Sequence, residues 1–208
     1  MAKNEDSTRK QILEAALELF AAKGYSGTSV QDVVSRTPFT KPTLYYHFGS
    51  KTGLFKALLE QASDGCYEIM QAAAASSDCL DEQLVNILAA MFQFFRDRKD
   101  LTRLAFAAAF AAPKELPADL NQGSRRSRAF NFFHSLISRA IANGTLTKSL
   151  NSRTLTYGIY GALSFYLMAN VLLPGTKLDR QTAEDVVNLF LNGAKLEARK
   201  SCPGRVRR

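Results

Sequence analysis

The sequence is poor in the residues from which most catalytic and metal sites are built. It has two histidines, His47 and His134, and three cysteines, Cys66, Cys79 and Cys202, with no C-x-x-C pair. Metal sites need several such ligands at short spacing. Neither a glycine-rich phosphate loop nor a nucleophile elbow follows a strand pattern. We therefore expect no catalytic residue, no metal and no cofactor, so that the protein is not an enzyme.

Signs of export are also lacking. Three cysteines cannot all pair with one another, and an unpaired thiol suits a reducing compartment. The first ten residues, MAKNEDSTRK, contain no apolar signal core. We expect a cytoplasmic protein.

The positive charge is unevenly distributed along the chain. The formal net charge is +8, yet residues 195–208 alone hold six basic residues and one acidic residue, whereas residues 1–60 hold eight and six. The excess lies mainly in a tail, of which we expect residues 201–208 to be disordered, because a Pro-Gly pair among arginines buries nothing. A basic tail also suits anionic lipid, so a helical adaptor or membrane-surface protein is the alternative to a DNA-binding protein.

One segment, residues 155–173, runs without charge for about the length that spans a bilayer. It also carries polar side chains that would lack hydrogen-bond partners in the hydrocarbon of a membrane, namely Thr156, Tyr157, Tyr160, Ser164, Tyr166 and Asn170. We therefore expect a helix buried on most sides and no membrane partner.

Strand and hairpin patterns are missing, whereas apolar residues recur at helical spacing along most of the chain. We predict an all-α fold with helices over about 8–23, 30–36, 41–48, 51–76, 84–95, 101–112, 129–142, 153–173 and 180–200. The short helices precede residue 50 and the long ones follow it. We predict two domains, 1–50 and 51–200, connected by the long helix at 51–76.

The most informative stretch is KPTLYYHF, residues 41–48. On a helical wheel Leu44 and Phe48 share one face, which must pack on neighbouring helices because so short a helix is unstable alone. The opposite face displays groups suited to DNA. Thr43 can bond base edges, and Pro42 or Tyr46 can touch a thymine methyl group.

Two short helices joined by a tight turn, the second of which carries these groups, have helix-turn-helix geometry. The alternative is a helical hairpin whose rings simply pack. Tyrosine hydroxyls, the His47 ring and the ammonium of Lys51 suit phosphate, and Lys41 has the reach for guanine or the backbone. On spacing alone, DNA binding and packing both remain open.

Residues 9–60 closely resemble the DNA-binding domain of the TetR family of bacterial transcriptional regulators. The resemblance is carried by three segments in order, ILEAALELF, KGYSGTSV and TKPTLYYHFGSKTGLF. It implies an N-terminal three-helix helix-turn-helix domain, with the motif over residues 29–48, and a larger C-terminal helical ligand-binding and dimerisation domain. One feature departs from the family: Thr37-Pro38 replaces the usual Ala-Gly of the turn, and proline cannot adopt the positive φ of glycine. We expect that turn to be built differently.

The resemblance also implies the DNA contacts and the partners. The expected contacts are Thr40, Lys41, Pro42, Thr43, Tyr45, Tyr46, His47 and Lys51, with Ser29 and Gln31 holding phosphate at the second helix. The partners are a double-stranded DNA operator of pseudo-palindromic sequence, a second copy of the chain and a small-molecule effector. Repression is the commoner mode in the family.

Small residues suggest where two copies meet. We predict a four-helix bundle formed by the last two helices of each subunit, with the interface residues Gly158, Ala162, Ala169, Val187, Phe190 and Leu191. Packing only within the subunit is the alternative.

Aromatic residues are concentrated in the middle helices. They exceed what one stripe per helix requires, and the resemblance implies a cavity there, so we predict a pocket for a hydrophobic or aromatic effector. Its predicted lining is Tyr67, Phe92, Phe95, Phe106, Phe110, Phe133, His134 and Tyr160. Core packing is the alternative for each of them.

Overall fold

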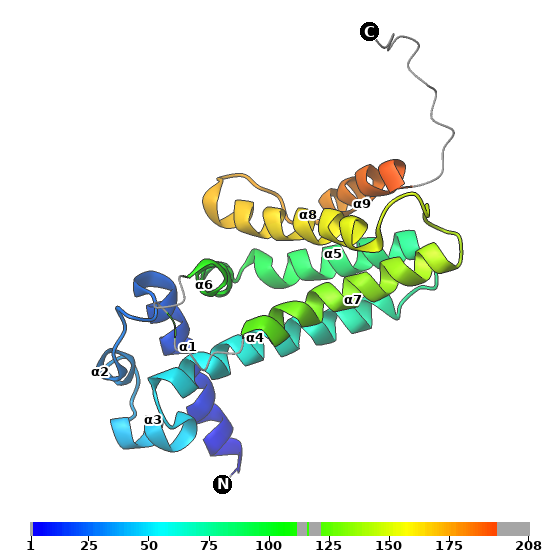
Figure 1. Ribbon diagram of the computed structural model, residues 1–208. Helices are drawn as coiled ribbons and strands as arrows, with labels where there is room; N and C mark the ends of the chain where they lie inside the picture. Colours follow the sequence, from blue (N-terminus) through cyan, green and yellow to red (C-terminus); the bar gives the residue numbers. More distant parts are fainter. Residues whose placement is uncertain (1, 112–115, 117–121, 195–208) are drawn as a thin grey trace.

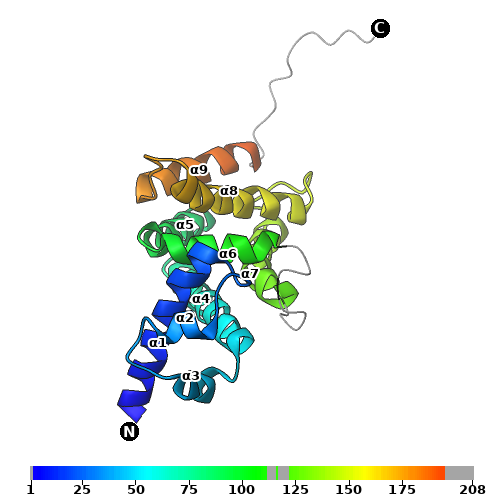
Figure 2. The ribbon, with the colours of Figure 1, turned by 90° about the vertical axis from the view of Figure 1, so that its left-hand side faces the viewer.

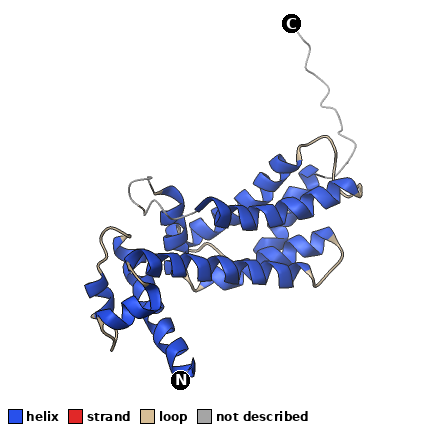
Figure 3. Ribbon diagram, turned by 60° about the horizontal axis from the view of Figure 1, so that its bottom comes forward, coloured by secondary structure: helices blue, strands red, loops and turns tan. Residues whose placement is uncertain are grey.

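The structure, a computed structural model, describes residues 2–111, 116 and 122–194. The predicted all-α class is confirmed: the described residues form helices and no strand (Figure 3). The helices are α1 (Ala2–Lys23), α2 (Val30–Val34), α3 (Lys41–Phe48), α4 (Lys51–Ala74), α5 (Leu80–Arg96), α6 (Lys99–Phe110), α7 (Gln122–Ala142), α8 (Ser152–Leu172) and α9 (Arg180–Ala194). The basic tail that we expect to be disordered lies outside the described residues.

The first three helices form a small unit at one end of the molecule (Figure 1). Their shared core contains Ile12, Leu19 and Phe20 of α1, Val33 of α2 and Leu44 of α3, each at most 2% exposed. Two boundaries differ from the prediction. Helix α1 starts six residues before the predicted residue 8, with an acidic residue in its first turn, where the helix dipole favours it, and α2 ends at Val34 instead of residue 36.

The remaining helices stack in layers (Figures 1 and 2). Helices α4 and α7 lie side by side, α5 packs on α4, and α8 and α9 form the outermost layer. Helix α5 is central, because it contacts α4, α6, α8 and α9. Its stripe of buried residues, from Leu84 to Phe95, forms much of the larger core.

Two helices contribute to both cores. The N-terminal half of α4 contributes Leu54, Phe55 and Leu58 to the small core, and its Met70 belongs to the large one. In α6, Leu104 and Ala108 pack into the small core, while Leu101 packs into the large one. The small core therefore does not stop at residue 50, and α6 completes it from the other half of the chain.

One face of helix α8 is more exposed than predicted. By length and composition it is the one helix of the described residues that could cross a membrane. It packs against α5, α6, α7 and α9, yet Tyr157, Phe165 and Leu172 are 60%, 59% and 65% exposed. The expectation of a helix buried on most sides was therefore wrong for this outer face.

The dual role of α6 predicts the effect of Leu104→Ala. Leu104 is 1% exposed in the small core, so its truncation should lower the free energy of unfolding by about 2–5 kcal/mol. Hydrogen exchange of the α1 amides should accelerate, although α1 lies far from residue 104 in sequence. The control is Leu150→Ala, where the leucine is 40% exposed. Unchanged exchange in α1 would contradict the assignment of α6 to the small core.

Candidate nucleic-acid interface

Helix α3 buries one face and presents the other. Leu44 is 0% exposed and Phe48 9% exposed, whereas Tyr46 is 76% exposed and Tyr45 46% exposed. Lys41 and Pro42 are exposed, and Thr43 and His47 are half-buried. The predicted orientation of the helix is therefore present, with Tyr46 as the most prominent side chain of the outer face.

The end of α3 is fixed by a tight junction with α4. Gly49 ends α3 with a φ of 71°, which favours glycine, and the Ser50 hydroxyl accepts a hydrogen bond from the Gly53 N–H at 3.0 Å. A Cβ atom at Gly53 would lie 1.9 Å from the Phe48 carbonyl oxygen. Only glycine allows α4 to start so close to the end of α3.

The turn between α2 and α3 uses the Thr37 hydroxyl in place of the glycine that is usual in the family, as expected. The Thr37 N–H and Oγ1 both donate to the Val34 carbonyl, at 3.1 and 3.2 Å, and Thr37 Oγ1 accepts from the Phe39 N–H at 3.3 Å. No residue from 35 to 40 has a positive φ. The turn is thus built without the backbone conformation that proline forbids, and Phe39 packs against the small core.

The start of α2 is closed by a capping box. The Ser29 Oγ accepts from the Asp32 N–H, and the Asp32 carboxylate accepts from both the Ser29 N–H and its hydroxyl, at 2.9 and 2.7 Å. These bonds from Ser29 hold the pKa of Asp32 below its usual value. Both donors of Ser29, which we expected to hold phosphate, are therefore engaged within the chain, whereas Gln31 is exposed.

Lys51 also has an internal role that sequence reasoning missed. Its Nζ donates to the carbonyl oxygens of Tyr25 and Thr28, both at 3.0 Å, and lies 4.2 Å from the centroid of the Tyr25 ring. The ammonium thus joins the first residue of α4 to the loop before α2. With two of its three N–H groups used, at most one remains for a phosphate.

Arg9 was not among the predicted residues, although the fold places it at this end of the molecule. Its guanidinium carbon lies 5.5 Å from the centroid of the Phe48 ring. The N-terminal turns of α1 lie at the same end of the molecule as helix α3 (Figures 1 and 2). The sequence does not indicate this position for Arg9, because only the packing of α1 on α3 brings its side chain next to Phe48.

The eight residues predicted to form an effector pocket do not line the two cavities described below. Phe92, Phe95 and Phe133 are buried in the large core, and Phe110 is 79% exposed. Tyr160 contacts the rings of Phe130 and Phe133, His134 bonds Ser152 Oγ at 3.1 Å, Tyr67 packs on Phe132, and Phe106 stacks on Phe110. The pocket therefore remains a prediction.

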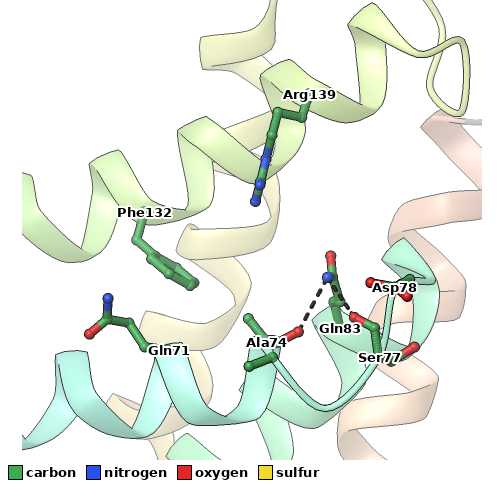
Figure 4. A pocket seen from close by; sticks show the side chains of 8 residues that line it. Gln71, Ala74, Ser77, Asp78, Gln83, Phe132 and Arg139 are labelled. Carbon is green, nitrogen blue, oxygen red and sulfur yellow. Dashed lines mark hydrogen bonds between the residues drawn. The ribbon is translucent and has the colours of Figure 1, made fainter.

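Two cavities lie elsewhere, between the α4–α5 turn and α7. One has a volume of about 280 Å³ and is lined by residues that include Phe132 and Arg139 (Figure 4). The second, of about 240 Å³, shares Asp78, Gln83 and Arg139 with it.

The residues predicted for the dimer interface divide into two groups. Ala169, Val187 and Leu191 are 6%, 1% and 2% exposed within the single chain. Their own subunit covers them and leaves little of their surface for a partner, so their place in the interface stays a prediction. Gly158 is exposed and Ala162 half-buried, but the half-buried Phe190 lies against Gly158, at 3.5 Å from the place of a Cβ atom.

A buried anchor face, an exposed tyrosine-bearing face and a preceding short helix define a helix-turn-helix DNA-binding protein. Comparison with known proteins gives the family. Residues 12–58 match the family model described as bacterial regulatory proteins, tetR family. The N-terminal part of the chain thus matches the DNA-binding domain of the TetR family of transcriptional regulators.

One relative, YdgC, extends the match over most of the chain, and another matches a shorter part of it. The chain is 24% identical over 193 residues to YdgC of Bacillus subtilis, an uncharacterized HTH-type transcriptional regulator, covering 89% of this chain and 92% of that protein. It is 36% identical over 62 residues to IcaR of Staphylococcus aureus, a negative transcriptional regulator of the biofilm operon icaADBC, covering 30% and 31%.

The fold is similar to that of FadR, a transcriptional regulator from Bacillus subtilis solved in complex with stearoyl-CoA. The TM-score is 0.77 at 18% identity, over 88% of this chain and 98% of that one. These relatives are transcriptional regulators, and the matches support the same role for this chain.

The internal bonds of Lys51 predict that Lys51→Met is destabilising. Methionine keeps the apolar stem but leaves two part-buried carbonyl oxygens without a donor, so the free energy of unfolding in urea should fall by about 1–3 kcal/mol. The matched control is Lys41→Met, at an exposed lysine of α3, which should change stability by less than about 0.5 kcal/mol. Equal urea midpoints for both variants would show that the Lys51 bonds do not support the fold.

Proposed function

We propose that the chain binds a pseudo-palindromic DNA operator as a homodimer in the bacterial cytoplasm and represses transcription until a small molecule releases it. The observation that carries this proposal is the position of Tyr46, which is 76% exposed on a helix whose opposite face is buried. Large exposed aromatic side chains on a rigid short helix are suited to a groove of DNA. The regulator IcaR, to which the chain is 36% identical over 62 residues, supports repression as the mode.

The proposed DNA contacts follow the exposed side of α3. Thr43 and Tyr46 would reach base edges and thymine methyl groups, with Pro42 beside them. Lys41, Thr40, Tyr45 and His47 would contact phosphates on either side. The Thr40 and Thr43 hydroxyls lie 3.0 Å apart and either can be the donor, so Thr40 can orient the Thr43 hydroxyl toward a base edge.

Arg9 and Gln31 extend this surface. Both are exposed and lie on elements that flank α3. Their side chains would add phosphate contacts from α1 and α2, while Ser29 and Lys51 would act mainly by holding α2 and α4 in place. The affinity of such contacts falls steeply with salt concentration, because each releases counterions from DNA.

The exposed face of α8 is the proposed dimer interface. One side of α8 carries Gly161, Phe165 and Leu172 at helical spacing. On the neighbouring α9, Leu189 is 78% exposed. Monomeric proteins rarely expose continuous apolar surface of this kind. A two-fold related copy would bury it, forming the four-helix bundle from α8 and α9 with residues different from those first predicted.

The effector would act through the two helices shared by both cores. The fold relative FadR was solved with stearoyl-CoA, which supports a hydrophobic effector among the aromatic residues of the larger half. A ligand changes operator affinity only if it binds one arrangement of the reading helices better than another. Helices α4 and α6 connect the cores, so a shift of either would move α3.

Tyr46→Ala tests the DNA interface. On duplexes selected from random sequence, the variant should bind about tenfold or more weakly, because a base contact is lost, and its stability should change by less than about 0.5 kcal/mol. The control is Phe110→Ala, at another aromatic residue that is 79% exposed. Fluorescence anisotropy at several salt concentrations measures the DNA affinity of both variants. Equal loss in the two variants, or salt-sensitive binding to anionic liposomes without binding to duplex DNA, would overturn the proposal.

Phe165→Glu tests the dimer. A charge in the centre of the apolar face should convert a dimer to a monomer at micromolar concentration in sedimentation, because the carboxylate would be buried without a partner. Gln93→Glu adds the same charge at an exposed position of α5 and should leave the dimer intact. A wild-type monomer at these concentrations would refute the interface, as would a Phe165→Glu dimer.

A further inference from the structure

The cavity between the α4–α5 turn and α7 lies at the end of α4 that is remote from α3 (Figures 1 and 4). With the adjoining cavity it shares Asp78, Gln83 and Arg139. Its volume of about 280 Å³ is near the lower end for small-molecule sites. A ligand held there must be small.

Two side chains of opposite charge, Asp78 and Arg139, line this space, and both are also exposed to solvent. Among the described residues, no ion pair within 4.0 Å joins Arg139 to Asp78 or ties either of them to another side chain. Among the described exposed arginines, Arg36, Arg103, Arg128 and Arg180 pair with carboxylates, whereas Arg139, like Arg9 and Arg153, has no such pair. Arg139 and Asp78 therefore keep their hydrogen-bonding groups available on opposite sides of one cavity.

The turn that carries Asp78 is held rigidly. The Gln83 side-chain amide donates to the carbonyl oxygens of Ala74 and Ser77, at 3.2 and 2.7 Å (Figure 4). The Ser77 hydroxyl donates to the Glu82 carboxylate at 2.7 Å and accepts from the N–H of residue 79 at 3.0 Å. A carboxylate on so fixed a turn loses little entropy when it binds a ligand.

The other end of the cavity is apolar. Phe132 of α7 forms its wall and is itself held edge-on by Tyr67 of α4, with ring centroids 5.8 Å apart. In Figure 4 the Arg139 side chain extends into the space between Phe132 and Gln83, and Asp78 lies beyond Gln83. The order across the site is thus an aromatic ring, a cation and an anion.

We propose that this cavity binds a small zwitterion with an apolar side chain, of the aromatic α-amino acid class. The ligand carboxylate would pair with the Arg139 guanidinium, its ammonium group with the Asp78 carboxylate, and its ring would pack on Phe132. A simple carboxylate would be repelled by Asp78 and a simple amine by Arg139. Only a molecule carrying both charges satisfies both groups.

A regulatory consequence rests on the proposed function. The ligand would join the C-terminal end of α4 to α5 and α7, and α4 begins at Lys51, next to α3. Binding itself involves no DNA, so the test below can fail or succeed independently of the proposed role in transcription.

The test is fluorine NMR of the full chain with 4-fluoro-L-phenylalanine and two analogues. One analogue, 3-(4-fluorophenyl)propionate, lacks the ammonium group, and the other, 4-fluorophenethylamine, lacks the carboxylate. We expect saturable line broadening with the amino acid and at least about tenfold weaker binding of each analogue, since each loses one charge-assisted pair.

Two variants test which ligand group each charged side chain binds. Arg139→Gln should weaken binding of the amino acid at least about tenfold, and Asp78→Asn should remove its advantage over the propionate analogue. Matched controls at exposed positions outside the cavity, Arg153→Gln and Asp185→Asn, should bind as the wild type does, and circular dichroism confirms that each variant is folded.

Three results would overturn the proposal. The first is the absence of saturation up to about 10 mM, the range expected for a few weak contacts. The second is equal binding of the amino acid and the propionate by the wild-type chain. The third is unchanged binding by folded Arg139→Gln.

Discussion

The burial of Leu44 and Phe48 is the interaction on which the DNA-reading surface depends. Helix α3 has eight residues, too few to be stable alone, so these two side chains must hold it against α1, α2 and α4. The close approach at Gly53 fixes the direction in which α3 ends. With both constraints in place, the exposure of Tyr46 follows from the helical period.

The small core is completed by residues from both halves of the chain. Leu104 and Ala108 of α6 lie in it together with Leu54 and Phe55 of α4. A DNA-binding unit that shares its core with two helices of the larger half cannot reorient without moving them. This gives the molecule a physical route between a bound small molecule and the spacing of two reading helices, provided that the ligand prefers one arrangement.

The outer layer shows why small residues alone are a poor guide to an interface. Gly158 lies where the ring of Phe190 in the same subunit approaches to within 3.5 Å of its missing Cβ atom. The small residue thus serves packing of α8 on α9 within one chain. The exposed apolar residues of the outer face, Phe165 and Leu172, are bulky instead, and in sequence they look like core.

The sequence by itself determined the helical class, the limits of α3 and the identity of the DNA-binding domain. These depend on local signals: periodicity, caps, and a run of residues that matches a family. The tertiary structure alone decided that Lys51 faces inward, that Arg9 lies over Phe48, and that Asp78 and Arg139 share a cavity. Each of these pairs residues distant in the chain, and no spacing in the sequence encodes which helices meet.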